Sequence, residues 1–150
     1  KLLGVQTLRD ATMESLLVHR ESLGKLLFRR ASHVVSENAR VLSFAMALQN
    51  GESPVLGAMM SQSHRSLRDD FEVSSPELEA MVEAGLSAPG AIGIRLTGAG
   101  FGGACVALVH KNQVEAFAQA TSLAYRHRTG IEPAVWSTGA AAGASSEKFR

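Results

Sequence analysis

The sequence predicts an α+β domain in which helices come first and a small antiparallel sheet follows. Apolar residues recur with helical spacing through much of residues 11–86, as expected for helices that bury one face. From Ile92 to Thr97 the pattern changes to the alternation of a strand with one buried side. A second apolar stretch follows after a short glycine-rich loop. Strands joined by so short a loop pair antiparallel, which excludes a doubly wound parallel sheet.

The first two expected helices follow from apolar spacing. Residues from about Ala11 to Arg30 carry three leucines at helical spacing, Leu16, Leu23 and Leu27. Ser32 is then a suitable N-cap for a second helix, which Gly51 would end. That helix would place four apolar residues on one face: Val34, Val41, Ala45 and Leu48.

Two Ser-Pro pairs predict the starts of the next two helices. Ser53-Pro54 and Ser75-Pro76 each combine an N-cap residue with a proline at the first helical position. The first of these helices would run to about Leu67. The second carries Glu77 in its first turn, where the helix dipole favours a carboxylate. Its inward-facing residues would be Leu78, Met81 and Val82.

The remaining expected elements are a strand, a helix and a last strand. Cys105 to Val109 is continuously apolar, as expected for a strand buried on both faces. A helical period returns at Val114 and ends at Gly130. Residues 131–138 would form the last strand, with Trp136 as a large anchor, and residues 139–146 would be a loose tail. Neither an internal repeat nor a linker is visible, so residues 1–150 are one expected domain.

Composition excludes several classes of function. The net charge of +1 gives no case for a nucleic-acid or anionic-membrane partner, and no apolar run is long enough for a membrane span. The single cysteine, Cys105, cannot form an internal disulfide, which suits a reducing cytoplasm. The chain begins at Lys1 without a signal or transit pattern, and we expect a piece of a longer polypeptide.

The stretch RLTGAGFGGACVALV, residues 95–109, holds four glycines in six positions. Gly98, Gly100 and Gly103 match the dinucleotide pattern G-x-G-x-x-G, but a strand follows where that site needs a helix. A protein-kinase phosphate loop is excluded because neither H-R-D nor D-F-G follows Lys111. Two interpretations stay open. The loop is a glycine-rich hairpin without a ligand, or its exposed amides form an anion site or a surface for another loop.

Other polar residues give weaker signals. Asp69 and Asp70 could bind a metal or act as a base, although adjacent carboxylates at a helix end more often face solvent or cap the backbone. The five histidines lack the spacing of zinc sites. Lys111 is expected to begin an exposed turn, and Cys105 to be an inert packing residue. The basic run 125–130 would complement the dipole at a helix end.

Several segments in order resemble a known family. RLTGAGFGGACVALV resembles the third conserved motif of the GHMP small-molecule kinases. SHRSLRDDFEVSSPELEAMV, residues 63–82, resembles the preceding segment of the galactokinases in that family. LRDAT, residues 8–12, and RRASHVVSENARVL, residues 29–42, are also similar to galactokinase segments. The pattern departs at Ser75 and Ala104, where galactokinases commonly carry cysteine.

This resemblance implies the C-terminal domain of a two-domain kinase, a ferredoxin-like antiparallel sheet with additional N-terminal helices. The sugar-recognition motif, the phosphate-binding loop and the catalytic aspartate would lie in an N-terminal half absent from this sequence. The implied reaction is phosphoryl transfer from ATP, with Mg²⁺, to galactose, and this fragment alone would be inactive. No residue here is expected to be catalytic or to bind metal. The residues facing the nucleotide phosphates would be Thr97, Gly98, Ala99, Gly100, Phe101, Gly102 and Gly103.

Two alternatives remain. The first is another GHMP kinase, acting on mevalonate or homoserine, because specificity would be determined in the missing half. The second is a free-standing ferredoxin-like binding module. An RNA-binding module is disfavoured, since the expected strands carry no row of aromatic residues for base stacking.

Overall fold

The structure is a computed structural model that describes residues 2–146. Helices and an antiparallel strand pair confirm the predicted α+β class. The helical elements before the sheet are η1 (Leu8–Asp10), α1 (Met13–Val18), α2 (Arg20–Gln49), α3 (Ser53–Ser66), the π-helical turn η2 (Leu67–Phe71) and α4 (Pro76–Leu86). The sheet consists of β1 (Ala91–Thr97) and β2 (Ala104–Val109), and it is followed by η3 (Lys111–Gln113) and α5 (Val114–Thr129).

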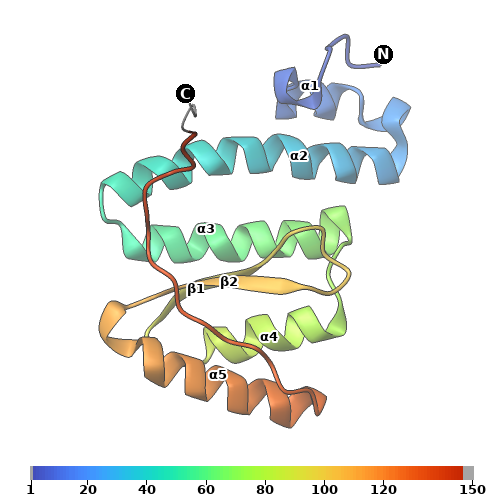
Figure 1. The fold of residues 1–150 in the computed structure, drawn as a ribbon. Helices are drawn as coiled ribbons and strands as arrows, with labels where there is room; N and C mark the ends of the chain where they lie inside the picture. Colours follow the sequence, from blue (N-terminus) through green and yellow to red (C-terminus); the bar gives the residue numbers. More distant parts are fainter. Residues whose placement is uncertain (1, 147–150) are drawn as a thin grey trace.

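The helices are arranged on both sides of the strand pair (Figure 1). α3 and α4 both pack against β1, α2 packs against α3, and α5 packs against α4. In the register of the sheet, Arg95 lies opposite Val106 and Thr97 opposite Ala104. No helix in the described residues 2–146 is long and apolar enough to cross a membrane.

α3 lies unusually close to β1 because glycines face each other at the crossing. A Cβ atom placed on Gly57 would lie 2.1 Å from the carbonyl oxygen of Ile92. On the strand, a Cβ atom on Gly93 would lie 3.0 Å from the Cα of Gly57. A side chain at Gly57 would therefore push α3 away from the sheet.

A small apolar cluster lies directly below the loop that joins the two strands. It consists of Leu67, Val73, Leu78 and Leu96, with Cys105 packed against it. Leu96 is completely buried, and it lies near the end of β1, two residues before the loop begins at Gly98. Burial of each large apolar side chain contributes about 1.5–3 kcal/mol, so this cluster fixes the base of the loop.

The predicted boundary between the first two helices is wrong, although α2 ends just before Gly51 as predicted. α2 runs without a break through Ser32, and the irregular point lies at Gly24, with φ 69° and ψ 166°. Ser32 is compatible with a helix interior, whereas only glycine takes this conformation at low cost. The buried residues of α2 are Ala31, His33 and Ala47. Val41 and Leu48, which were expected to face inward, are more than half exposed.

The next predicted helix starts are confirmed. α3 begins at Ser53 with Pro54 in its first turn, although the N-cap is Glu52. α4 begins at Pro76, and its N-cap Ser75 accepts a hydrogen bond from the Leu78 N–H at 3.3 Å. α5 ends at Gly130, which has the left-handed φ of 74° and closes the helix as predicted.

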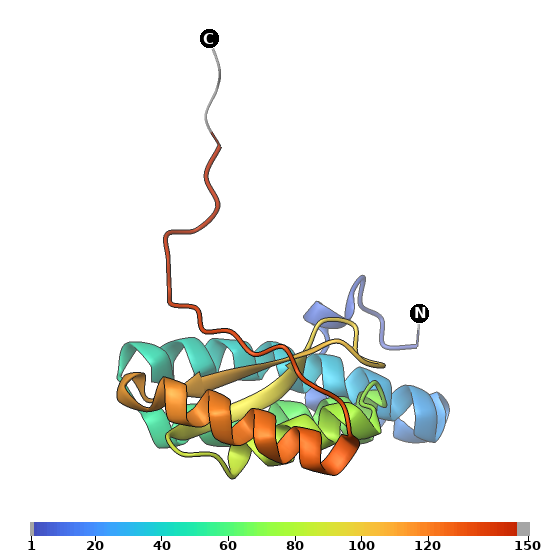
Figure 2. The ribbon, with the colours of Figure 1, turned by 60° about the horizontal axis from the view of Figure 1, so that its bottom comes forward.

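The expected last strand is not formed. Residues 131–138 have no regular secondary structure, and Trp136 is 74% exposed rather than an anchor. Pro133 lacks the N–H group that a sheet ladder needs. Figure 2 shows the segment beyond α5 leaving the body of the domain, and residues 139–146 are the loose tail that was predicted.

The expected burial of the second strand on both faces is also wrong. β2 pairs with β1 alone in the described chain. Val106 on β2 is 47% exposed. β2 has the continuous apolar sequence that is typical of a strand buried on both faces. In the described residues, however, only one face of β2 is covered.

Candidate functional site

The glycine loop, residues 98–103, connects β1 to β2 in an unusual backbone conformation. Five of its six residues have positive φ: Gly98 80°, Gly100 82°, Phe101 60°, Gly102 131° and Gly103 98°. Residues with a side chain rarely adopt these angles, which accounts for four glycines in so short a segment. Phe101 is the exception, and its side chain is 75% exposed.

One contact inside the chain explains why Gly100 has no side chain. The Phe101 N–H donates a hydrogen bond to the carbonyl oxygen of Val73 at 2.7 Å. A Cβ atom on Gly100 would lie only 2.1 Å from that oxygen. Gly100 therefore lets the loop approach the backbone of residues 72–75, which we call the support segment.

The other three glycines face open space. A Cβ atom on Gly98, Gly102 or Gly103 would meet nothing within 4 Å. Packing within the described residues therefore does not account for them. Consecutive backbone N–H groups in such conformations can form a concave site for an anion, and this part of the loop leaves room for one.

The support segment is held on one side by two arginines of α2. Glu72 has a left-handed φ of 58°, and its carboxylate pairs with both Arg29 and Arg30. The same arginines donate to the carbonyl oxygens of Asp69 and Asp70. Hydrogen bonds from Arg29 and then Arg30 lower the pKa of Glu72 below its ordinary value. α2 is thereby joined to the segment that positions the glycine loop.

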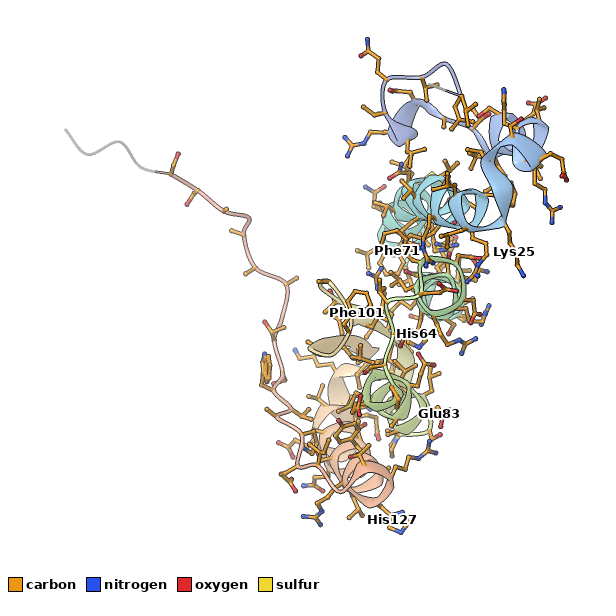
Figure 3. All side chains as sticks on the ribbon, turned by 90° about the vertical axis from the view of Figure 1, so that its right-hand side faces the viewer. Lys25, His64, Phe71, Glu83, Phe101 and His127 are labelled. Atoms are coloured by element: carbon orange, nitrogen blue, oxygen red, sulfur yellow. The ribbon has the colours of Figure 1, made fainter. Side chains whose placement is uncertain are left out.

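On the other side, Glu79 of α4 connects the support segment to the end of β1. Its carboxylate accepts a hydrogen bond from the Ser74 hydroxyl, and it lies 3.0 Å from Nε2 of buried His64. Nδ1 of His64 accepts the backbone N–H of Leu96 at 3.4 Å, so Nε2 is the ring nitrogen that faces Glu79. Figure 3 labels His64 on α3 and Phe101 in the glycine loop.

The pKa of Glu79 reflects opposing influences. Burial raises it, but the Ser74 hydrogen bond, the charge of His64 and the hydrogen bond from Arg68 together hold the pKa below its ordinary value. The ionised carboxylate is thus the form that the folded chain favours.

A second polar cluster joins α2 to the end of α3. Nδ1 of His33 lies 3.0 Å from the Ser66 hydroxyl, and that hydroxyl donates to Asp70 at 2.9 Å. The Phe71 ring stacks on His33 with 4.6 Å between ring centres. Burial is the main cause that lowers the pKa of His33.

The other candidate residues from the sequence are explained by their contacts or positions within the fold. Asp69 pairs with its neighbour Arg68 and Asp70 accepts from Ser66, so both carboxylates are paired within the chain. Lys111 begins the exposed turn η3. Burial, with a smaller effect of the Glu79 charge, raises the pKa of the Cys105 thiol to about 11, which suits an unreactive packing residue. The described histidines, cysteine and carboxylates form no group of three that could hold a metal ion.

Sequence reasoning found the loop but missed its supports. Arg29 and Glu72, or His64 and Glu79, are far apart in the chain, and no local spacing predicts that they meet. The only local signal was the density of polar residues in 63–79.

A family model and individual relatives both connect the chain with the GHMP kinases. Residues 44–127 match the family described as GHMP kinases C terminal. The chain is 45% identical over 127 residues to a galactokinase of Roseiflexus sp., covering 85% of this chain and 32% of that protein. It is 49% identical over 109 residues to the galactokinase of Homo sapiens, covering 73% of this chain and 28% of that protein.

A solved structure is also similar. The galactokinase of Lactococcus lactis, complexed with galactose, superimposes with a TM-score of 0.80 at 35% sequence identity. The alignment covers 86% of this chain and 34% of that one. The chain therefore spans about a third of the length of the relatives it matches.

Proposed function

Since this chain belongs to the GHMP kinase family, we propose that it is the C-terminal part of a galactokinase, which transfers a phosphoryl group from ATP to the anomeric hydroxyl of galactose. The observation that carries this proposal is the agreement among relatives. Proteins named galactokinase, from bacteria to mammals, are 41–50% identical to the chain. If the chain came from a GHMP kinase that acts on another alcohol, we would expect these relatives to carry other names.

The proposed roles of this chain and of the rest of the enzyme follow from the length of the chain relative to those proteins. Residues 1–150 form one domain, and an N-terminal part outside this chain recognises the sugar and carries the catalytic aspartate. The chain alone is then inactive. We place the enzyme in the cytoplasm, supported by the unpaired thiol of Cys105.

The glycine loop has the proposed role of facing the nucleotide. Its backbone N–H groups would bind ATP phosphates or a second loop that holds them, and the open space beside Gly98, Gly102 and Gly103 fits either. Mg²⁺ would neutralise the phosphates, held by ATP and by residues outside this chain. The proposed nucleotide-facing residues are Thr97, Gly98, Ala99, Gly100, Phe101, Gly102 and Gly103.

A chimeric enzyme tests the proposal. The C-terminal part of Lactococcus lactis galactokinase, whose fold this chain shares, is replaced by this chain, and ATP-dependent ADP release is measured. We expect turnover with galactose in the chimera and none with the chain alone. Because the Lactococcus part of the chimera would recognise the sugar, turnover with galactose reports that this chain completes a galactokinase active site.

Two controls make the result interpretable. The same junction carrying the C-terminal part of the Roseiflexus galactokinase shows whether the joint is tolerated. Gly102→Val in the loop is expected to raise the KM for ATP at least about tenfold, while Gly143→Val in the tail leaves it unchanged. A folded chimera that is inactive where the Roseiflexus control is active contradicts the proposal, as does turnover by the chain alone.

A further inference from the structure

A cleft of about 330 Å³ lies between α2, α3 and the strand pair. Its size falls in the range of small-molecule sites, about 300–1,000 Å³. Most of its surface is apolar, contributed by Val41 and Phe44 of α2, Met59 of α3, and Val106 and Leu108 of β2. It lies on the side of the sheet that carries Arg95 and Val106, a cross-strand pair.

One end of the cleft carries a cluster of charges. Arg40 and Arg95 both pair with the single carboxylate of Glu37. Ser63 accepts a hydrogen bond from Arg95 at 2.9 Å and donates one to Glu37 at 2.6 Å. The exposed fractions of the side chains are 15% for Arg40, 20% for Glu37 and 29% for Arg95, so these charges are largely withdrawn from water.

The cluster has an excess of positive charge. Two guanidinium groups face one carboxylate, which leaves a formal charge of +1 in a poorly solvated place. Among residues 2–146, Nη2 of Arg95 has no hydrogen-bond partner, although Nε donates to the carbonyl oxygen of Leu96 and Nη1 donates to both Glu37 and Ser63. The two N–H groups of Nη2 are therefore the donors of this guanidinium that remain available for a second anion.

We propose that this cleft binds an amphipathic monocarboxylate, with its carboxylate on Arg40 and Arg95 and its hydrocarbon part against Val41, Phe44 and Val106. The charge excess selects an anion, and the apolar walls select an aliphatic or aromatic tail. A nucleotide fits poorly, because its ribose and phosphates would lie against apolar side chains. The site is distinct from the glycine loop, but it is close to it. Arg95 precedes Thr97 by two residues, roughly 7 Å along a strand.

Calorimetric titration of the 150-residue chain with octanoate tests the proposal, with 1-octanol and octylamine as probes of the same length. We expect octanoate to bind at least about tenfold more tightly than either. Arg95→Gln and Arg40→Gln should each weaken octanoate binding by a similar factor. Arg126→Gln, on the exposed side of α5, is the matched control and should have no effect.

A second variant keeps the test valid if loss of an arginine disturbs folding. Val106→Glu places a carboxylate opposite Arg95 on a half-exposed strand position, where the new pair supports the sheet while it occupies the guanidinium. Octanoate binding should be lost, and circular dichroism should be unchanged. Equal binding of octanol, no binding of octanoate, or retained binding in Val106→Glu would each overturn the proposal. Displacement of octanoate by MgATP would overturn it too, because the cleft would then belong to the nucleotide site.

Discussion

Single glycines of one loop lack a side chain for two different physical reasons. Gly100 and Gly103 share left-handed backbone angles, φ 82° and 98°, but only Gly100 touches the support segment. We expect Gly103→Ala to lower the free energy of unfolding by about 1–2 kcal/mol through backbone strain. Gly100→Ala should lower it by about 2–4 kcal/mol, because the hydrogen bond from Phe101 to Val73 is also disturbed.

Urea denaturation followed by circular dichroism measures both free energies. Gly143→Ala, in the tail where nothing lies within 4 Å of a Cβ atom, serves as the reference and should be neutral. Equal losses for Gly100→Ala and Gly103→Ala would contradict the assignment of Gly100 to an internal contact. The density of glycines was visible in the sequence, but the partner of Gly100 was not, because Val73 lies on a different segment.

At the level of elements, prediction succeeded where the deciding signal is local. Ser75 before Pro76 starts α4, and Gly130 ends α5, because caps act on the adjacent backbone. It failed where a distant partner decides. The side of α2 that carries Ala31 and His33 faces α3, instead of the side that carries Val41. Apolar spacing alone does not indicate which side of α2 packs against α3. The irregularity at Gly24 was likewise missed, since a glycine in a helical pattern does not reveal its φ.

The contact between α2 and α3 gives a prediction for pH. The pKa of His33 lies below 6.5, lowered mainly by burial and only partly offset by the charge of Glu37. The folded chain therefore prefers the neutral ring, and its stabilising effect is complete above the unfolded pKa of about 6.5. As the pH falls below that value, the unfolded state binds a proton first, and the free energy of unfolding decreases.

Unfolding by urea between about pH 7.5 and pH 5.5 measures this effect, whose slope cannot exceed about 1.4 kcal/mol per pH unit for one group. His33→Gln keeps a hydrogen-bond donor for Ser66 and should flatten the dependence. His127→Gln, exposed on α5 (Figure 3), should not. The carboxylates with lowered pKa act below about pH 4.5 and do not overlap this window; they are Asp69, Glu72, Glu77 and Glu79. An equally steep profile in His33→Gln would contradict the role given to its burial.

For the molecule as a whole, the distribution of apolar surface is the feature that the fold leaves unexplained. Three large apolar residues in the C-terminal half of α2 that lie outside the proposed cleft are 56–70% exposed: Leu42, Met46 and Leu48. Exposed apolar surface of this kind often marks an interface in soluble proteins, and about two thirds of the length of the relatives lies outside the matched part and could cover it.

We therefore expect the isolated chain to associate with itself. Sedimentation velocity over a roughly hundredfold range of concentration should show a rising average mass, since apolar association follows mass action. Leu42→Lys combined with Met46→Lys should shift the chain toward monomer, because each lysine places a charge on the surface that must lose water. Leu123→Lys on α5 is the matched control. Leu123 is similarly exposed, at 62%, but it belongs to α5, which lies on the other side of the strand pair from α2 (Figure 1). A chain that is monomeric at every concentration would mean that the α2 surface is tolerated in water. Association that persists in the double variant but disappears in Leu123→Lys would show that the interface lies on α5. The apolar surface expected to contact a further part of a longer chain would then be that of α5 and not that of α2.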